Sequence, residues 1–361
     1  MNIGILNSGG DCPGLNAVIE GAVGAAARRG WTTIGFEDGF EGLLSDGNNP
    51  RYKILTPEHC RGLRAMGGTI LGTVNKGNFA IKIGVNQKGE IEPAVLAKTK
   101  ETIDRLNIKA LIVVGGDGSQ STSLLLSAIG LPVVGVPKTI DNDLGATDVT
   151  FGFNSAVTVV SEALDRLKTT ANAHQRMMVV EVMGRHAGWI ALEGGIAGSA
   201  DVILLPEIPF DLDIVIKSIE QRKLRKQREI LVVVSEGAKI ANELVLVDGQ
   251  TKGEVRLGGI GNIIAEKLEE ATGIETRSCV LGHTQRGGSP IAFDRILGTR
   301  FGAYAITLIE RKQFSHMVAL HGTEMVSVPI EEAVKTLKIV DPACQLVETA
   351  RDLGICFGDA L

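Results

Sequence analysis

The sequence predicts an α/β fold in which a mostly parallel β-sheet is covered by helices on both faces. Three observations lead to this prediction. The chain has 361 residues, enough for about two domains. Its composition, 44% hydrophobic and 22% charged, is typical of a chain with a large buried core. Short, continuous β-branched runs alternate with helical patterns, which is the pattern of buried parallel strands joined by helices.

The expected elements follow one another along the chain. The first apolar run, residues 2–6, leads into a glycine-rich stretch and then an alanine-rich helix that extends to about Arg29. Further strands are predicted at residues 110–114, 131–136, 177–183, 229–237 and 277–283. The run at 110–114 also leads into a glycine-rich stretch and a helix. Residues 242–259 are predicted to form a β-hairpin, because Asp248 and Gly249 are typical of its turn.

The charge balance and the cysteines exclude several classes of protein. There are 37 basic and 42 acidic residues, the formal net charge is -5, and 4% of residues are aromatic, so no nucleic-acid partner is expected. No apolar run approaches the ~18 residues of a membrane span, and the start lacks the basic region of a signal peptide. We expect a cytoplasmic protein with no membrane partner. The five cysteines are predicted to be free thiols, and Cys12 to be an ordinary small thiol, with oxidation as the alternative.

Most of the unusual residues follow the predicted strands, at the edge where open α/β sheets bind ligands. In "NSGGDCPG", residues 7–14, the glycines would let a phosphate approach the backbone, or would simply form a tight turn. In "GGDGS", residues 115–119, the carboxylate of Asp117 would repel a phosphate unless a cation intervened. We therefore interpret Asp117 as a ligand of Mg²⁺, with an acidic helix N-cap as the alternative.

The stretch "VPKTIDNDL", residues 136–144, places Lys138 close to Asp141 and Asp143. In an extended segment the two aspartates would share one face, because they are two residues apart. Two acids and a lysine beside phosphate loops suit phosphoryl transfer to an alcohol, in which a carboxylate takes the hydroxyl proton. A solvated acidic turn is the alternative.

Several basic residues are expected near strand ends on the same edge of the sheet. Arginine binds phosphate bidentately and histidine can donate to a phosphate oxygen, although any one of these residues could be an ordinary salt-bridge partner. Their repetition favours an anionic, phosphorylated substrate. They are Arg176, Arg185, Arg277, His283 and Arg286. The run "QRKLRKQR", residues 221–228, is interpreted as a solvated helical face rather than a site for an effector phosphate.

Seven segments, taken in order, resemble the 6-phosphofructokinase family. They cover residues 3 to about 305 and read "NSGGDCPGLN", "GGDGS", "PKTIDND", "HQR", "MGRHAGW", "SEG" and "LGHTQRGGSP". The resemblance implies two Rossmann-like three-layer domains with mostly parallel sheets and an active site in the cleft between them. Residues 1–152 and about 285–340 would form the nucleotide-binding domain, and residues 153–284 and about 341–361 the sugar-phosphate-binding domain.

The resemblance also implies an activity and a role for each matching residue. The activity is transfer of the γ-phosphoryl group of ATP to O1 of fructose 6-phosphate, a step of glycolysis, by a dimer or tetramer that uses Mg²⁺. Asp141 would be the general base, beside Thr139 and Asp143, while Arg185 would steady the transferring phosphoryl group. The nucleotide would contact Gly10, Gly116, Asp117, Gly118 and Ser119, and the sugar phosphate would contact Thr139, Asp141, Met183, Gly184, Arg185, Glu236, His283 and Arg286. Arg176 and Arg277 would reach the substrate from a neighbouring subunit.

The phosphate donor depends on two positions. The resemblance implies that pyrophosphate-using members of the family have the same motif with aspartate at the position of Gly118. A carboxylate there would crowd and repel the α-phosphate of a nucleotide. Lys138 favours pyrophosphate, but the space left by Gly118 is the stronger constraint, so ATP is expected. A non-catalytic sugar-phosphate-binding subunit is a further alternative. The chain departs from bacterial ATP-using members at Asn75 and Lys76, near the expected phosphates, and at Glu20 and Gly24, where allosteric members have effector-binding arginines.

Overall fold

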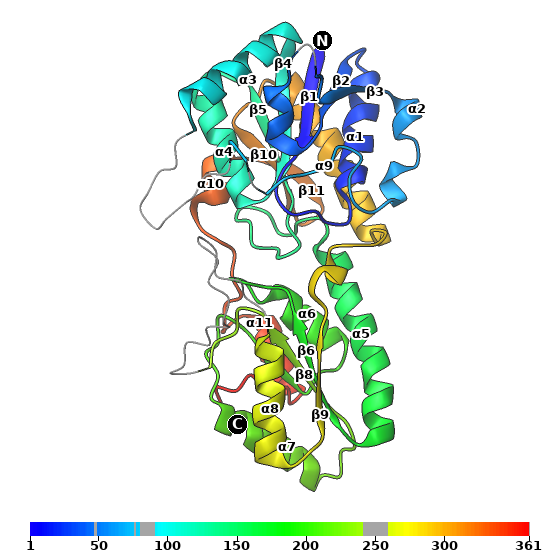
Figure 1. Cartoon of the computed structure of the whole chain (residues 1–361), viewed down its shortest axis with the longest axis vertical. Coiled ribbons are helices and arrows are strands. Elements are labelled where there is room, and N and C mark those ends of the chain that lie inside the picture. Colours follow the sequence, from blue (N-terminus) through cyan, green and yellow to red (C-terminus); the bar gives the residue numbers. More distant parts are fainter. Residues whose placement is uncertain (47–48, 76, 80–90, 241–258, 361) are drawn as a thin grey trace. The chain divides into compact units, whose positions relative to one another are not determined.

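A computed structural model describes residues 1–46, 49–75, 77–79, 91–240 and 259–360. The predicted hairpin at 242–259, apart from its last residue, and Lys76 lie outside the described residues. The described part forms two compact units. Unit 1 comprises Met1–Ile140, Leu144–Asn154 and Arg286–Leu337, and unit 2 comprises Asp141–Asp143, Ser155–Gln285 and Lys338–Leu361. Figure 1 labels the elements of both.

Unit 1 is built on a seven-stranded sheet with the order β11-β10-β5-β4-β1-β2-β3. The five inner strands run parallel, and the two edge strands, β3 and β11, run antiparallel to their neighbours. The bounds are β1 Asn2–Asn7, β2 Thr32–Phe36, β3 Tyr52–Leu55, β4 Ile108–Gly115, β5 Val133–Pro137, β10 His316–His321 and β11 Glu324–Pro329. The predicted runs at 2–6, 110–114 and 131–136 are therefore confirmed as strands.

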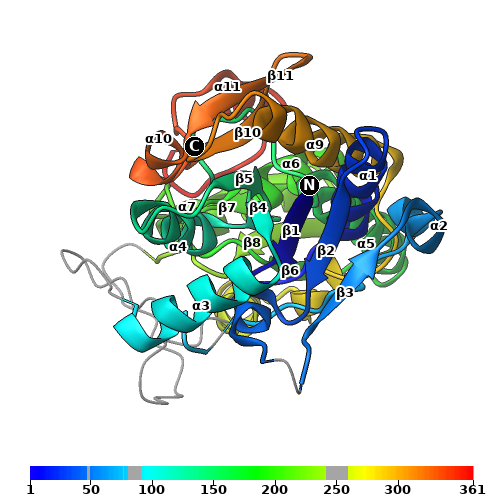
Figure 2. The same cartoon turned by 90° about the horizontal axis from the view of Figure 1, so that it is seen from above.

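Helices cover both faces of this sheet because each presents an apolar stripe to it. Figure 2 shows α1 and α9 on one face and α3 and α4 on the other. The helices of unit 1 are α1 Leu15–Ala27, α2 Pro57–Cys60, α3 Pro93–Arg105, α4 Asp117–Ala128, α9 Ala292–Glu310 and α10 Ile330–Lys335, with 3₁₀ turns η1 Gly39–Leu44 and η2 Leu63–Ala65. Along the α1–α9 contact, a Cβ on Gly302 would lie 2.1 Å from the carbonyl oxygen of Val18, so glycine is what allows the close approach.

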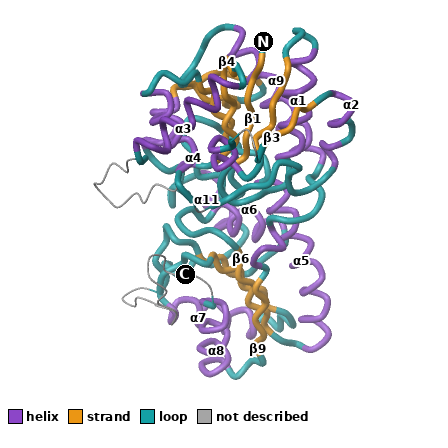
Figure 3. The backbone as a smooth tube through the Cα atoms, turned by 45° about the horizontal axis from the view of Figure 1, so that its top comes forward, coloured by secondary structure: helices purple, strands orange, loops and turns teal. Residues whose placement is uncertain are grey.

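Unit 2 contains a four-stranded, all-parallel sheet with the order β7-β8-β6-β9. Its strands are β6 Met177–Val182, β7 Val202–Leu204, β8 Ile230–Ser235 and β9 Thr276–Val280. Its helices are α5 Phe153–His174, which begins at the border of unit 1, α6 Trp189–Ala197, α7 Leu212–Leu224, α8 Ile260–Thr272 and α11 Gln345–Asp352, and η3 spans Gly282–Gln285. Figure 3 shows strands flanked by helices within each unit. The predicted α/β class is confirmed.

In each unit, three neighbouring strands carry the loops expected to be functional. In unit 1 these are β5, β4 and β1, which are adjacent in the sheet, and in unit 2 they are β8, β6 and β9. Because parallel strands end at a common edge, the loops that follow them are brought together within their own unit. No helix in the described part of the chain combines the length and apolar character that crossing a membrane requires.

Candidate active site

The glycine-rich loop between β1 and α1 is held by the end of β4 and by the loop that contains Thr73. The amide of Ser8 donates to the carbonyl of Val114 at 2.9 Å, and the Thr73 hydroxyl donates to the carbonyl of Gly9 at 2.5 Å. Gly9 and Gly14 have φ of +85° and +110°, and a Cβ on Gly14 would lie 2.7 Å from the Phe151 ring. The tight turn therefore needs both glycines, whatever else the loop does.

Two cations contact the middle of this loop. The ammonium of Lys138 donates to the carbonyl of Gly10 at 2.6 Å, and the guanidinium of Arg286 donates to the carbonyl of Asp11 at 3.1 Å. Lys138 is 4% exposed, and its backbone amide also bonds to the carbonyl of Gly115 at 3.1 Å. Both cations belong to unit 1. The two glycine-rich loops and the start of the acidic stretch are thus brought together by direct hydrogen bonds.

The segment after β4 turns directly into a helix. Helix α4 begins at Asp117, its N-cap is Gly116, and no side chain caps it. Asp117 is exposed and occupies the first helical turn, where a carboxylate is stabilised by the helix dipole. The alternative interpretation of Asp117 as an N-cap is therefore wrong.

Gly118 is not required by the fold. A Cβ at this position would have no atom within 4 Å, and its φ is outside the left-handed range. Glycine within a helix costs about 1 kcal/mol relative to alanine. The fold would therefore accept a larger residue here, so the fold alone gives no reason for glycine at this position. Ser119, next along the helix, is 8% exposed.

The donor set at this edge fits Mg²⁺ in the form in which nucleotide sites hold it. Magnesium there is bound by one or two carboxylates together with phosphate oxygens and water. Asp117 offers an exposed carboxylate beside the glycine-rich loops. Within the residues that the structure describes, no group of three or more histidine, cysteine, aspartate or glutamate side chains forms a metal site made of protein alone.

The acidic stretch after β5 differs from the prediction. Asn142, between the two aspartates, has a φ of +51°, so the segment is not extended and the argument that Asp141 and Asp143 share one face is wrong. Asparagine tolerates this left-handed conformation better than most residues. The carbonyl of Thr139 accepts the Thr150 hydroxyl at 2.7 Å, and the carbonyl of Asp143 accepts the amide of Lys338 at 2.8 Å. The turn is therefore fixed through its backbone.

In unit 2 the segments after β6 and β8 are interlocked. Gly184 has a φ of +136°, and its carbonyl accepts both the Ser235 hydroxyl at 2.6 Å and the amide of Gly237 at 3.1 Å. The amide of Glu236 donates to the carbonyl of Val182 at 2.9 Å. These bonds fix the backbone that carries Glu236 and the exposed Arg185.

Gln285 is a residue that sequence reasoning missed. It is fully buried, its side-chain oxygen accepts the amide of Met183 at 3.2 Å, and its side-chain nitrogen donates to the carbonyl of Gly282 at 2.9 Å. It thereby ties the segment after β6 to the one after β9, which carries the exposed His283. Its position between His283 and Arg286, two predicted phosphate ligands, could have pointed to it. A neutral amide, however, does not by itself indicate phosphate binding.

The expectation that all the basic residues lie at the same edge of the sheet is wrong for Arg176 and Arg277. Arg176 precedes β6 and Arg277 is the second residue of β9, so both lie at the amino ends of their strands, opposite the segments that carry Arg185 and His283. Both arginines contact Glu275, at 3.3 Å and 2.8 Å respectively. Within one chain, these two arginines therefore lie at the opposite edge of the sheet from Arg185 and His283.

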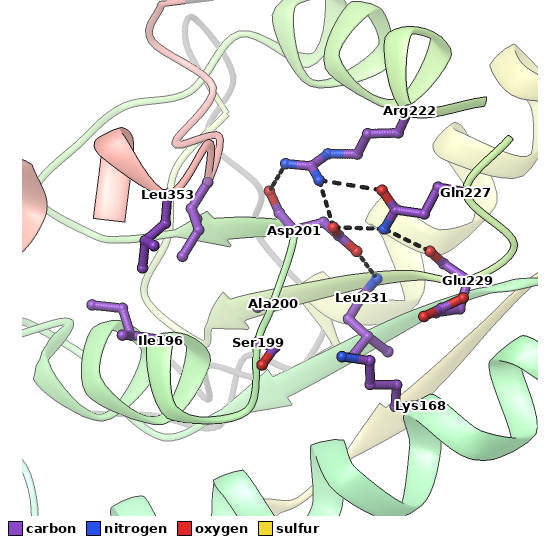
Figure 4. A pocket seen from close by; sticks show the side chains of 11 residues that line it. Lys168, Ile196, Ser199, Ala200, Asp201, Arg222, Gln227, Glu229, Leu231 and Leu353 are labelled. Carbon is purple, nitrogen blue, oxygen red and sulfur yellow. Dashed lines mark hydrogen bonds and ion pairs between the residues drawn. The ribbon is translucent and has the colours of Figure 1, made fainter. Parts of the chain in front are cut away.

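A pocket of about 330 Å³ lies at the amino ends of β7 and β8 (Figure 4). Arg222 bonds to Asp201 across it at 2.6 Å, and Gln227 bonds to the same carboxylate at 2.8 Å. The run 221–228 is thus mostly exposed, as predicted, but Arg222 and Gln227 turn inward and α7 ends at Leu224. None of the predicted site residues lines this pocket.

Two further predictions concern Cys12 and Glu20. All five cysteines are described and free. Cys12 is fully buried, and burial raises the pKa of its thiol to about 12, which disfavours the thiolate needed for oxidation. Glu20 bonds to Arg64 at 2.6 Å. Partial burial raises the pKa of Glu20, but the hydrogen bonds from Arg64 and Gly62 outweigh burial and hold it below its ordinary value.

Together, the parallel sheets, the glycine-rich loops and the acidic residue at the start of a helix define an α/β protein with features that are typical of phosphate-binding sites. The phosphofructokinase family profile matches residues 2–309. The chain belongs to the phosphofructokinase family.

Known proteins are similar over the whole chain. The ATP-dependent 6-phosphofructokinase of Chloroflexus aggregans is 49% identical over 100% of this chain and 99% of its own length. The solved phosphofructokinase of Saccharomyces cerevisiae has a TM-score of 0.78 at 30% identity, over 92% of this chain and 45% of that one. The pyrophosphate-dependent phosphofructokinase of Marinobacter aquaeolei has a TM-score of 0.78 at 22% identity, over 94% of this chain and 86% of that one, and shows the fold alone.

Proposed function

We propose that this chain is an ATP-dependent 6-phosphofructokinase, which transfers the γ-phosphoryl group of ATP to O1 of fructose 6-phosphate. Family membership and the names of its full-length relatives support the reaction. Gly118 is the observation that supports ATP most directly, because the fold does not need glycine there and a nucleotide needs the space. Lys138, which favours pyrophosphate in the sequence, bonds to a backbone carbonyl in the structure.

The proposed roles follow from charge and position. Asp141 takes the proton of the sugar hydroxyl, with Thr139 and Asp143 beside it, while Arg185 offsets the charge of the phosphoryl group in transit. The backbone at Gly10, Gly116, Gly118 and Ser119 binds the nucleotide. Asp117 would hold Mg²⁺, which supplies positive charge against the donor phosphates when it is bound.

A second set of residues binds the sugar phosphate. Met183, Gly184 and Glu236 contact the sugar, and His283 and Arg286 bind its 6-phosphate through charge-assisted hydrogen bonds. Arg176 and Arg277 serve the site of a neighbouring subunit in a homo-oligomer. Their place at the amino ends of β6 and β9 supports this assignment, because it separates them from Arg185 in their own unit.

A coupled assay tests the function and the donor separately. Purified protein is supplied with fructose 6-phosphate and Mg²⁺, together with either ATP or pyrophosphate, and fructose 1,6-bisphosphate is measured. We expect turnover with ATP. Turnover with pyrophosphate alone would contradict only the donor, whereas no product with either donor would favour the non-catalytic sugar-phosphate-binding alternative.

A further inference from the structure

Two consecutive carbonyls of the glycine-rich loop are each held by a cation from a distant part of the chain. Lys138 reaches Gly10 at 2.6 Å from the end of β5, and Arg286 reaches Asp11 at 3.1 Å from the segment that precedes α9. Such bonds, in which the donor is charged, are roughly twice as strong as neutral ones. The loop therefore has strong restraints at the two peptide groups that follow its glycine pair.

These bonds set the direction of the amides as well. A trans peptide group is planar, so its N–H points away from its C=O. The carbonyl of Gly10 is turned toward Lys138, so the N–H of Asp11 points away from the ammonium. The carbonyl of Asp11 is turned toward Arg286, so the N–H of Cys12 points away from the guanidinium. Among the described residues, neither amide has a hydrogen-bond acceptor. The loop is thus oriented before any phosphate binds.

The surroundings leave little room for another loop conformation. A Cβ on Gly10 would lie 2.9 Å from the Arg286 guanidinium, and one on Gly9 would lie 3.1 Å from the Lys138 ammonium. Gly9 is held by a further segment: its carbonyl accepts the Thr73 hydroxyl, and its amide donates to the carbonyl of Val74 at 3.4 Å. The loop is thus bonded both to the Thr73–Val74 segment and to the two cations.

We propose that Lys138 and Arg286 are positioning residues for the nucleotide loop, acting through the carbonyls of Gly10 and Asp11. This rests on the proposed function, in which the loop binds the nucleotide. Arg286 then has two roles, because it also binds the sugar 6-phosphate in that proposal. Lys138 acts through the loop and does not select the donor, so its loss affects both donors alike.

The test measures the binding of Mg-ADP by calorimetry with no sugar phosphate present. Each of Lys138→Met and Arg286→Met should raise the dissociation constant about 10-fold, the effect of losing one charge-assisted hydrogen bond. Arg286→Lys, which keeps a cation, should restore part of the affinity. His283→Gln is the matched control: it should raise the KM for fructose 6-phosphate and leave nucleotide binding unchanged.

The double variant distinguishes a shared loop from two separate effects. If both cations hold one structure, Lys138→Met combined with Arg286→Met should weaken binding by less than the product of the single effects. Thermal unfolding identifies any variant that has merely lost stability. Nucleotide binding within 2-fold of wild type in both single variants, both folded, would overturn the inference. A wild-type protein that binds no Mg-ADP would instead count against the proposed function.

Discussion

Asp141 is the residue on which the proposed chemistry depends most directly. Replacing it with alanine removes the group that takes the sugar hydroxyl proton, so kcat should fall by ~10² or more. The binding of fructose 6-phosphate should remain largely intact, because in the proposed function His283 and Arg286 bind its phosphate. Initial rates give kcat, and calorimetry gives the affinity. A variant with nearly normal kcat would rule out Asp141 as the base.

Gly118 governs the donor in the proposed function. Gly118→Asp should lower kcat/KM for ATP by roughly 10², because a carboxylate beside the α-phosphate is repelled by it. The fold should accept the change, since a Cβ there meets nothing within 4 Å. Gly118→Ala is the control, and it should keep ATP as the donor. An aspartate variant that uses ATP normally would show that this position does not discriminate.

At the scale of single residues, the sequence predicted the chemistry better than the geometry. The types and order of the residues pointed to phosphoryl transfer, and the family match agrees with them. The conformation of Asn142 could not be predicted, because asparagine is compatible with both extended and left-handed backbone. The hydrogen bond from Lys138 to Gly10 could not be predicted from the sequence either, because it joins residues 128 positions apart.

At the scale of elements, replacing two glycines with alanine should change the free energy of unfolding in opposite directions. Gly184→Ala should lower the free energy of unfolding by about 3 kcal/mol, because its φ is +136° and a Cβ would lie 2.5 Å from the Ser235 hydroxyl. Gly24→Ala, within α1 and with nothing within 4 Å, should instead raise it by about 0.5–1 kcal/mol. Urea unfolding measures both. Equal effects of the two substitutions would contradict the role of backbone conformation.

The ion pair between Glu20 of α1 and Arg64 of η2 predicts a dependence of stability on pH. The pKa of Glu20 is held below its ordinary value of 4.5, so the pair stabilises the fold above that pH and the contribution is lost as the pH falls. Glu20→Gln should therefore cost about 0.5–1 kcal/mol at pH 7, a modest value because Arg64 is largely exposed to solvent. The difference from wild type should shrink in urea titrations at and below pH 4.5. A constant difference would exclude the pair as its cause.

The elements that the sequence revealed are those with strong local signals. The six runs predicted as strands correspond to β1, β4, β5, β6, β8 and β9. Strand β7, Val202–Leu204, was missed because three residues carry no readable pattern, and the antiparallel edge strands β3 and β11 mix polar with apolar residues. Such strands form because a neighbouring strand offers hydrogen bonds, which is information absent from their own sequence.

At the scale of the whole molecule, the proposal that subunits share active sites predicts the activity of mixed oligomers. Asp141→Ala and Arg176→Ala should each be nearly inactive alone. Subunits of the two variants, dissociated and reassembled together, should recover up to about a quarter of the wild-type activity, because random pairing of dimers leaves that share of sites with both residues intact. The coupled assay before and after mixing measures this. No recovery, with mixed oligomers verified by mass, would place Arg176 in the site of its own chain.

The open space at Gly118 also bears on how this protein could change over generations. A glycine codon and an aspartate codon can differ by a single nucleotide, and a Cβ at this position would meet no atom of the helix or its neighbours within 4 Å. In the proposed function, a substitution at this single position would therefore bear on the phosphate donor with little influence on folding stability.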